Sequence, residues 1–238
     1  MSKGSFYEAT GRESVSASDI SASQASYTYN YRHLLPASQQ ARILDLGCSE
    51  GISMEWLSQQ GFSNIVGVDS DAVAIKRARE RLNGILSEDR FVCDDAMSYL
   101  QSCDDGSLDM VVMFNVIEHI PREVILDMMS EINRVLSSNG SFLAQTGNWE
   151  NPFNIGLFTR DFTHHVMYTK NSLRQLMILS GFSKSQISVQ PLRYRLTPRN
   201  APLFVLSPLC GWLVKMFALC MRMRIRETAA IIFCSVKK

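Results

Sequence analysis

The sequence predicts an α/β protein with a mostly parallel sheet that is covered by helices on both faces. Short, wholly apolar runs alternate with segments whose apolar residues recur at helical spacing. Strands of a parallel sheet are buried on both faces, so they appear as continuous apolar runs. The predicted strands are 43–46, 65–68, 90–92, 108–114, 141–145, 186–189 and 229–236.

Helices are expected in the gaps between these strands. The predicted helices are 52–60, 71–82, 96–101, 121–136 and 169–180. A glycine follows the first and the last of them, and Ser70 can cap the second. Pro121 is suited to open the fourth helix, which we expect to stop at Asn139-Gly140.

A chain of 238 residues has room for one domain with appendages. Its 46% hydrophobic and 20% charged residues exclude a wholly disordered, collagen-like or disulfide-scaffold protein. The alternating Tyr27, Tyr29 and Tyr31 favour a short edge segment or a lid helix over a ligand-binding role. We divide the chain into a Ser/Tyr-rich segment or lid (1–40), a core (41–190), a basic and apolar insertion (191–228) and the last strand of the core sheet (229–238).

The net charge of +1 conceals an asymmetry along the chain. Residues 191–238 carry nine Lys or Arg and one acid, a net of +8, which leaves 15 basic and 22 acidic residues, a net of −7, for residues 1–190. A basic end on an acidic body is a common way to meet phosphates, anionic lipid or nucleic acid.

The six cysteines form no CxxC pair, and no His cluster has zinc-site spacing. We interpret them as reduced thiols. The chain begins without an apolar signal segment. These features predict a cytoplasmic protein.

A small-residue loop, 47–51, lies between the first strand and the first helix. This arrangement directs backbone amides and a helix N-terminus at a polar ligand. Asp69 closes the next strand, eighteen residues after Gly51, where a carboxylate can accept hydrogen bonds from both ribose hydroxyls. Loop, spacing and acid together indicate a nucleoside site.

Two other interpretations of this loop are weaker. A NAD-type fingerprint needs G-x-G-x-x-G, but Ile52 occupies a place that close helix packing requires to be small. The loop also fits the G-x-S-x-G nucleophile elbow of hydrolases, with Ser49 as nucleophile. That elbow follows several earlier strands, whereas only about forty Ser-rich residues precede this one.

Several segments resemble, in order, the motifs of the class I S-adenosylmethionine (SAM)-dependent methyltransferases. They are Asp45-Leu46-Gly47-Cys48-Ser49-Glu50-Gly51, Val66-Gly67-Val68-Asp69, Cys93-Asp94-Asp95-Ala96, Phe114-Asn115-Val116-Ile117-Glu118-His119-Ile120 and Leu136-Ser137-Ser138-Asn139-Gly140. The resemblance covers about residues 41–190. It implies SAM as cofactor and a Rossmann-like seven-stranded, mostly parallel sheet with helices on both faces.

The resemblance also implies which residues bind the cofactor. Asp69 would hold the ribose and Asp95 the adenine amino group. The full expected set is Asp45, Gly47, Ser49, Gly51, Asp69, Ser70, Asp94, Asp95, Ala96, Phe114 and Asn115. The chain departs from the motifs at Ser49, which replaces the middle glycine, and at Asn115, which replaces the usual acid.

The segment after the fifth strand should hold the methyl acceptor, because ligands of open α/β sheets bind beyond the carboxyl ends of the strands. His119, His164 and His165 all map to this edge. A hydroxyl is a poor nucleophile until a base takes its proton, and His is the usual choice near neutral pH. We expect His164 to be the catalytic base, and His119 and Asp161 are the alternative candidates for that role. A structural pair of His164 with Asp161 is the alternative.

The string Asp161-Phe162-Thr163-His164 resembles methyltransferases of bacterial surface polysaccharide synthesis, which commonly have D-F-T-H-E; His165 stands in the Glu place. That resemblance implies O-methylation of a sugar or glycan, lipid-linked acceptors included. Other options are a small-molecule or quinone methyltransferase and a non-catalytic scaffold at the membrane. Glu118 with His119 resembles metal-assisted quinone methyltransferases, but Asn115 removes one ligand, so we expect no metal.

Residues 201–214 lack charge but contain Pro202 and Pro208, and Lys215 follows. A membrane-spanning helix needs about twenty apolar residues, so we expect none here. The apolar stretch with Arg residues at its border fits an interfacial segment, which places the protein peripherally at the inner membrane face. Cover over the acceptor site and a homodimer contact are equal alternatives. Nucleic acid is not expected as a partner, since aromatic residues do not interleave with the charges.

Overall fold

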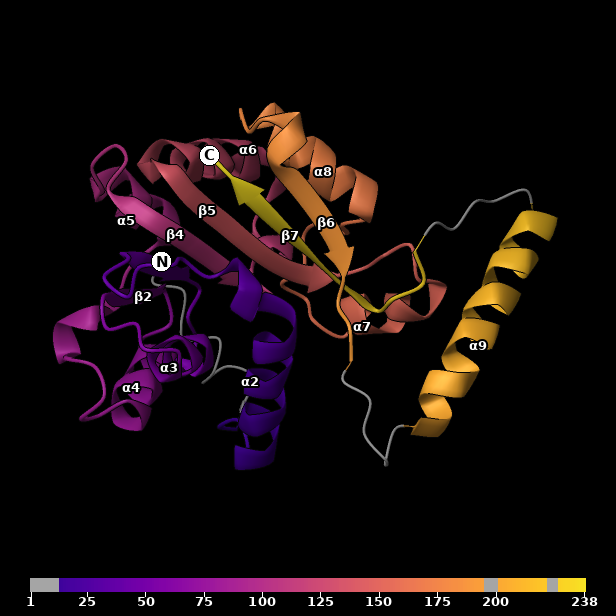
Figure 1. Ribbon diagram of the computed structural model, residues 1–238, viewed down its shortest axis with the longest axis horizontal. Coiled ribbons are helices and arrows are strands. Elements are labelled where there is room, and N and C mark those ends of the chain that lie inside the picture. Colours follow the sequence, from indigo (N-terminus) through magenta and orange to yellow (C-terminus); the bar gives the residue numbers. More distant parts are fainter. Residues whose placement is uncertain (1–12, 195–200, 222–226) are drawn as a thin grey trace.

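The computed structural model describes residues 13–194, 201–221 and 227–238 (Figure 1). Its strands are β1 Ile43–Leu46, β2 Ile65–Asp69, β3 Phe91–Cys93, β4 Leu108–Phe114, β5 Leu136–Gly147, β6 Ile187–Pro191 and β7 Ile231–Lys237. They form one sheet in the order β3-β2-β1-β4-β5-β7-β6. Strand β7 is antiparallel to both neighbours, and the other pairs are parallel. The predicted seven-stranded, mostly parallel sheet is confirmed.

Helices cover both faces of this sheet (Figure 1). The α-helices are α2 Ala17–Tyr31, α3 Ile52–Gln59, α4 Ala72–Arg81, α5 Ala96–Ser102, α6 Arg122–Val135, α7 Ile155–Thr159, α8 Lys170–Leu179 and α9 Ala201–Cys220. One apolar core lies under α5, α6 and α8, and a second lies under α2, α3 and α4. Adjacent strand residues alternate between the two, as Ile43 and Leu44 do.

The strands and helices lie within a few residues of their predicted positions, with two corrections. Helix α6 ends at Val135 and β5 begins at Leu136, so Asn139-Gly140 lies inside a strand instead of ending the helix. A register shift accommodates this early start, because Leu136 pairs with Leu108 before regular pairing resumes at Ser141. The second correction concerns α4, whose cap is Asp71 rather than Ser70; the Asp71 carboxylate accepts the Val73 and Ala74 amides.

The Ser-rich N-terminal segment contains a long helix, whereas the sequence predicts only a short edge segment or a lid helix around its tyrosines. Helix α2 begins after Ser16, whose hydroxyl accepts the Asp19 amide. It ends at Tyr31, which is fully buried against the sheet. Aromatic burial at one end therefore fixes a helix whose polar composition predicts little order.

Helix α9 lies at one end of the molecule (Figure 1), where Ala218 is buried and Gly211 lies close to Thr228. Pro208 lies inside it, although a proline lacks the amide that a regular helix uses. Several of its apolar side chains are more than half exposed: Leu206, Leu209, Trp212, Leu213, Phe217 and Leu219. Among the described residues, no helix has both the length and the apolar character that crossing a membrane requires. The arginines at 222, 224 and 226 that the sequence placed at its border lie outside the described residues.

Candidate functional site

The loop between β1 and α3 is built on left-handed backbone conformations. Gly47, Ser49 and Gly51 have φ values of +73°, +49° and +78°. A Cβ atom on Gly47 would lie 2.4 Å from Val116 Cγ2, so no other residue fits there without displacing Val116. Ser49 adopts a conformation that favours glycine, which accounts for the glycine that the resembling motif has at this place.

Asp69 joins this loop to the end of β2. One carboxylate oxygen accepts the Ser49 amide at 2.9 Å and the other accepts the Asp71 amide at 2.9 Å. Burial raises the pKa of Asp69, and these two amides oppose the rise. Loop and acid are therefore one bonded unit at the carboxyl edge of the sheet, as their spacing predicts.

Asp45 lies beneath the loop with 1% of its surface exposed. Its carboxylate accepts a hydrogen bond from the Ser53 hydroxyl of α3. Burial raises the pKa of Asp45 to about 7, while the Ser53 hydrogen bond acts to lower it. This geometry makes Asp45 a support for the loop rather than an exposed ligand contact.

Asp94 and Asp95 follow β3 beside Asp69, since the Asp94 amide donates to the Asp69 carbonyl at 3.2 Å. Asp95 caps α5, and its Oδ1 accepts the amides of Met97 and Ser98. Both side chains are exposed, as is Ser70, and Ala96 is the first residue of α5. The Asp95 oxygen atom that does not cap the helix can still accept a hydrogen bond from an adenine amino group.

Phe114 and Asn115, at the end of β4, contact α2. The Phe114 ring stacks on Tyr27 at 4.7 Å and on Tyr31 at 5.2 Å between ring centroids. The Tyr31 hydroxyl donates to Gln145, whose amide in turn donates to the Asn115 side chain at 3.1 Å. Helix α2 thus covers the end of β4, as a lid helix would.

A second group of polar side chains lies where β4 and β5 end. The rings of His119 and His164 are 4.6 Å apart between centroids. With Glu118, each offers one potential metal-ligand atom, and these three atoms lie within 4.8 Å of one another. Two segments of the chain 46 residues apart meet here, and the loop amides of His165 and Val166 fix the contact by donating to the Glu118 carbonyl.

Asp161 belongs to this group but is not the partner of the His164 ring. Its carboxylate accepts the Thr163 amide at 3.0 Å and the Thr163 hydroxyl at 2.6 Å. The His164 Nδ1 instead contacts the Phe158 carbonyl at 3.0 Å. His164 and Asp161 are nevertheless hydrogen-bonded through the backbone, since the His164 amide donates to the Asp161 carbonyl at 3.3 Å, which agrees with a structural pair that holds this loop together. The side chain of His165 is exposed.

Buried polar atoms without a hydrogen-bond partner gather around this group. Among the described residues they include Glu118 Oε2, Thr146 Oγ1, Trp149 Nε1 and the Tyr168 hydroxyl. The first two lie near each other without a hydrogen bond of normal geometry, and the Thr146 hydroxyl lowers the pKa of Glu118 against the rise that burial causes. Buried polar atoms are normally paired, so several orphans in one place indicate a polar ligand. Sequence reasoning left all four out of the expected site, although Glu118 stands inside the motif that contains His119.

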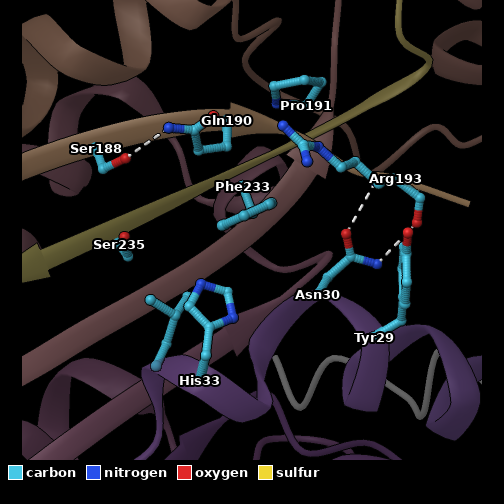
Figure 2. A pocket seen from close by; sticks show the side chains of 10 residues that line it. Tyr29, Asn30, His33, Ser188, Gln190, Pro191, Arg193, Phe233 and Ser235 are labelled. Atoms are coloured by element: carbon cyan, nitrogen blue, oxygen red, sulfur yellow. Dashed lines mark hydrogen bonds between the residues drawn. The ribbon is translucent and has the colours of Figure 1, made fainter.

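Figure 2 shows a separate hollow of about 450 Å³ between α2 and the β6–β7 end of the sheet. Asn30 closes one side of it by pairing with the Arg193 backbone, donating to the carbonyl and accepting the amide. Tyr29, His33, Gln190 and Ser235 also line it. It contains none of the residues expected to bind cofactor or acceptor.

Comparison with known proteins agrees with this geometry. Residues 43–140 match a family described as "Methyltransferase domain". This match covers less than half of the chain, and it agrees with the resemblance of the loop and strand-end motifs to SAM-dependent methyltransferases. The matched residues include the Asp45–Gly51 loop, Asp69, the Asp94–Asp95 pair and Glu118 with His119. The match favours the methyltransferase interpretation of the loop over a serine nucleophile elbow or a NAD site.

The fold extends this similarity to the whole chain. A SAM-dependent methyltransferase of Archaeoglobus fulgidus superposes with a TM-score of 0.69 over 98% of each chain, at 18% identity. Rice 24-methylenesterol C-methyltransferase 2 is 32% identical over 113 residues, 47% of this chain and 30% of that protein. Mouse EEF1A lysine methyltransferase 2 is 30% identical over 141 residues, 55% of each chain. The chain thus spans about half, or less, of the length of the rice and mouse proteins.

Proposed function

We propose that the chain transfers the methyl group of SAM to a hydroxyl oxygen of a sugar or glycan, lipid-linked acceptors included. The observation that carries the proposal is the pair of His119 and His164 rings, 4.6 Å apart among buried polar atoms at the end of β5. Hydroxyl-rich acceptors can satisfy such donors and acceptors, whereas a hydrocarbon cannot.

The chemistry is an in-line displacement, so most of the rate enhancement comes from positioning. The acceptor oxygen bonds to the methyl carbon, the carbon–sulfur bond breaks, and the sulfur keeps the electron pair as S-adenosylhomocysteine leaves. The hydroxyl must also lose its proton. His164 can accept it at Nε2, because its Nδ1 donates to the Phe158 carbonyl and the neutral ring then has its lone pair on Nε2.

A second candidate acceptor is an amine. Glu118 Oε2 is buried and has no hydrogen-bond partner, and a carboxylate so placed attracts a cationic group. The relatives' names include a sterol C-methyltransferase and a lysine methyltransferase, so they do not agree on one acceptor.

The test measures S-adenosylhomocysteine release and product mass with nucleotide sugars, lipid-linked glycans, peptidyl lysine and quinols as separate acceptors. The proposal expects methylated oxygen on a sugar, and His165→Ala should keep this activity because its side chain is exposed. Turnover with amines or quinols alone would replace the sugar acceptor. Tight SAM binding with no turnover on any acceptor would favour the scaffold alternative.

We further propose that α9 docks on an anionic membrane surface. Its exposed apolar side chains lie in the segment 191–238, which carries a net charge of +8, and apolar helices with basic borders bind such surfaces. Co-sedimentation with phosphatidylglycerol vesicles should exceed that with phosphatidylcholine vesicles. Replacing Trp212 and Phe217 by Ser should abolish it. A stable dimer that binds neither kind of vesicle would show that a second copy covers α9.

A further inference from the structure

We infer that Glu118, His119 and His164 bind a divalent transition metal ion of the zinc type at the acceptor edge. The ion's role in catalysis rests on the proposed function, but its binding does not. Two imidazoles and one carboxylate form a known ligand set of catalytic zinc sites, which keep a further position open for water or substrate.

The three side chains are close enough to share one ion. One potential ligand atom of each lies within 4.8 Å of the others. A tetrahedral ion with bonds of about 2.1 Å holds its ligand atoms roughly 3.4 Å apart. Side-chain rotation of Glu118 and the two rings would supply the remaining approach.

Hydrogen bonds orient both rings as metal ligands. His164 Nδ1 contacts a carbonyl, that of Phe158, which can only accept, so Nδ1 carries the proton. The Thr163 hydroxyl donates to Asp161, so it accepts from His119 Nδ1 at 2.7 Å. In both neutral rings the lone pair is therefore on Nε2. Ligating histidines typically donate their other N–H to a carbonyl or a similar oxygen in this way.

Glu118 provides the independent observation that points to a cation. Only 5% of the surface of Glu118 is exposed, and its Oε2 has no hydrogen-bond partner at normal distance, although the Thr146 hydroxyl lies near enough to favour the charged form. Burying a carboxylate oxygen without a partner costs free energy. A bound cation would compensate that cost directly.

The sequence points to Glu118 and His119 as potential ligands but gives no reason to add His164, so it predicts no metal. Asn115 replaces the acid that metal-assisted relatives use, and its side-chain oxygen accepts from Gln145. The third ligand here is His164, from the segment after β5. With the ion bound, His164 Nε2 would be a ligand and would no longer be available as the base of the proposed function. The ion would bind the acceptor hydroxyl and lower its pKa, so the proton would leave to solvent. The resulting alkoxide oxygen would bond to the methyl carbon as the carbon–sulfur bond breaks.

The test titrates Zn²⁺, with Mg²⁺ for comparison, into the chelator-treated full chain without SAM or acceptor. We expect one Zn²⁺ site per chain and an affinity at least ten-fold lower in His164→Ala, His119→Ala and Glu118→Gln. His165→Ala is the matched control and should bind as the wild type does. The absorption spectrum of the Co²⁺ form should show nitrogen and oxygen ligands without thiolate bands, which excludes binding by the six cysteines.

The variant Glu118→Gln distinguishes the loss of a metal ligand from the misfolding of the protein. Removing the unpartnered charge should leave the metal-free protein at least as stable as the wild type, while the thermal stabilisation by Zn²⁺ is lost. Equal Zn²⁺ affinity in His164→Ala and His165→Ala, or no binding by the wild type, would overturn the inference. Because SAM and acceptor are absent, neither result depends on methyl transfer.

Discussion

Two regions at the carboxyl edge of the sheet differ in how their carboxylates are hydrogen-bonded. We call the region of Asp69 and Asp95 the cofactor side and the region of Glu118 and His164 the acceptor side. At the cofactor side, Asp69 bonds two backbone amides of neighbouring loops, and Asp95 bonds two amides of its own helix. At the acceptor side, Glu118 Oε2 is buried without a partner, as are Trp149 Nε1 and the Tyr168 hydroxyl. The cofactor side is therefore a preformed binding site, which we call the cradle, of loop 47–51, Asp69 and Asp95. The acceptor side has buried polar groups whose hydrogen bonds a ligand would complete.

The first variant that tests this difference between the two sides is His164→Ala. If the acceptor side performs the activation and the cofactor side only binds, turnover should fall by roughly 10²- to 10⁴-fold. The affinity for S-adenosylhomocysteine should stay within about two-fold, because His164 contacts Phe158 and not the cofactor loop. Steady-state kinetics with calorimetry would measure both. Near-normal turnover would remove His164 from the mechanism.

The second test addresses the contact between the two sides. Gly47 of the cofactor loop approaches Val116, so Gly47→Ala adds a clash to a left-handed backbone at φ +73°. We expect a loss of about 2–4 kcal/mol in the free energy of unfolding. Gly84→Ala is the matched control: its φ is +77°, but a Cβ there meets nothing within 4 Å. Gly84→Ala should lower the free energy of unfolding by only about 1–2 kcal/mol. Equal losses in the two variants would show that the approach of Gly47 to Val116 contributes nothing to stability.

The third and smallest expected effect is the pH dependence of stability that Asp45, beneath the cofactor loop, causes. The folded-state pKa of Asp45 is raised to about 7 by burial, above its value of about 3.9 in an unfolded chain. Folding therefore takes up a proton between these values, and stability falls as pH rises from about 4 to about 7, then levels off. Asp45→Asn should remove on the order of 2 kcal/mol of that decline between pH 5 and 8.

Urea unfolding at pH 5, 6 and 8 would measure this change. Burial also raises the pKa of Asp69 and of Glu118, so a smaller decline of the same sign should remain in the variant. Parallel pH curves for Asp45→Asn and the wild type would show that Asp45 is ionised in the folded protein throughout this range.

The sequence predicts the cofactor side well because its signals are local. Apolar runs locate the strands, and Asp69 follows its loop by eighteen residues. Local signals fail where tertiary contacts decide. Asn139-Gly140 looks like a helix stop, yet pairing with β4 draws Leu136 into β5. The group of Glu118 and His164 depends on residues 46 apart in the chain, and only the folded sheet edge brings them together.

Titration of S-adenosylhomocysteine into the wild type, Asp69→Ala and Asp89→Ala by calorimetry tests the central claim most directly. The account predicts one binding site in the wild type, an affinity roughly 100-fold lower in Asp69→Ala, and no change in Asp89→Ala, an exposed acid outside the cradle. No binding by the wild type at millimolar concentration, or equal affinity in all three proteins, would contradict it.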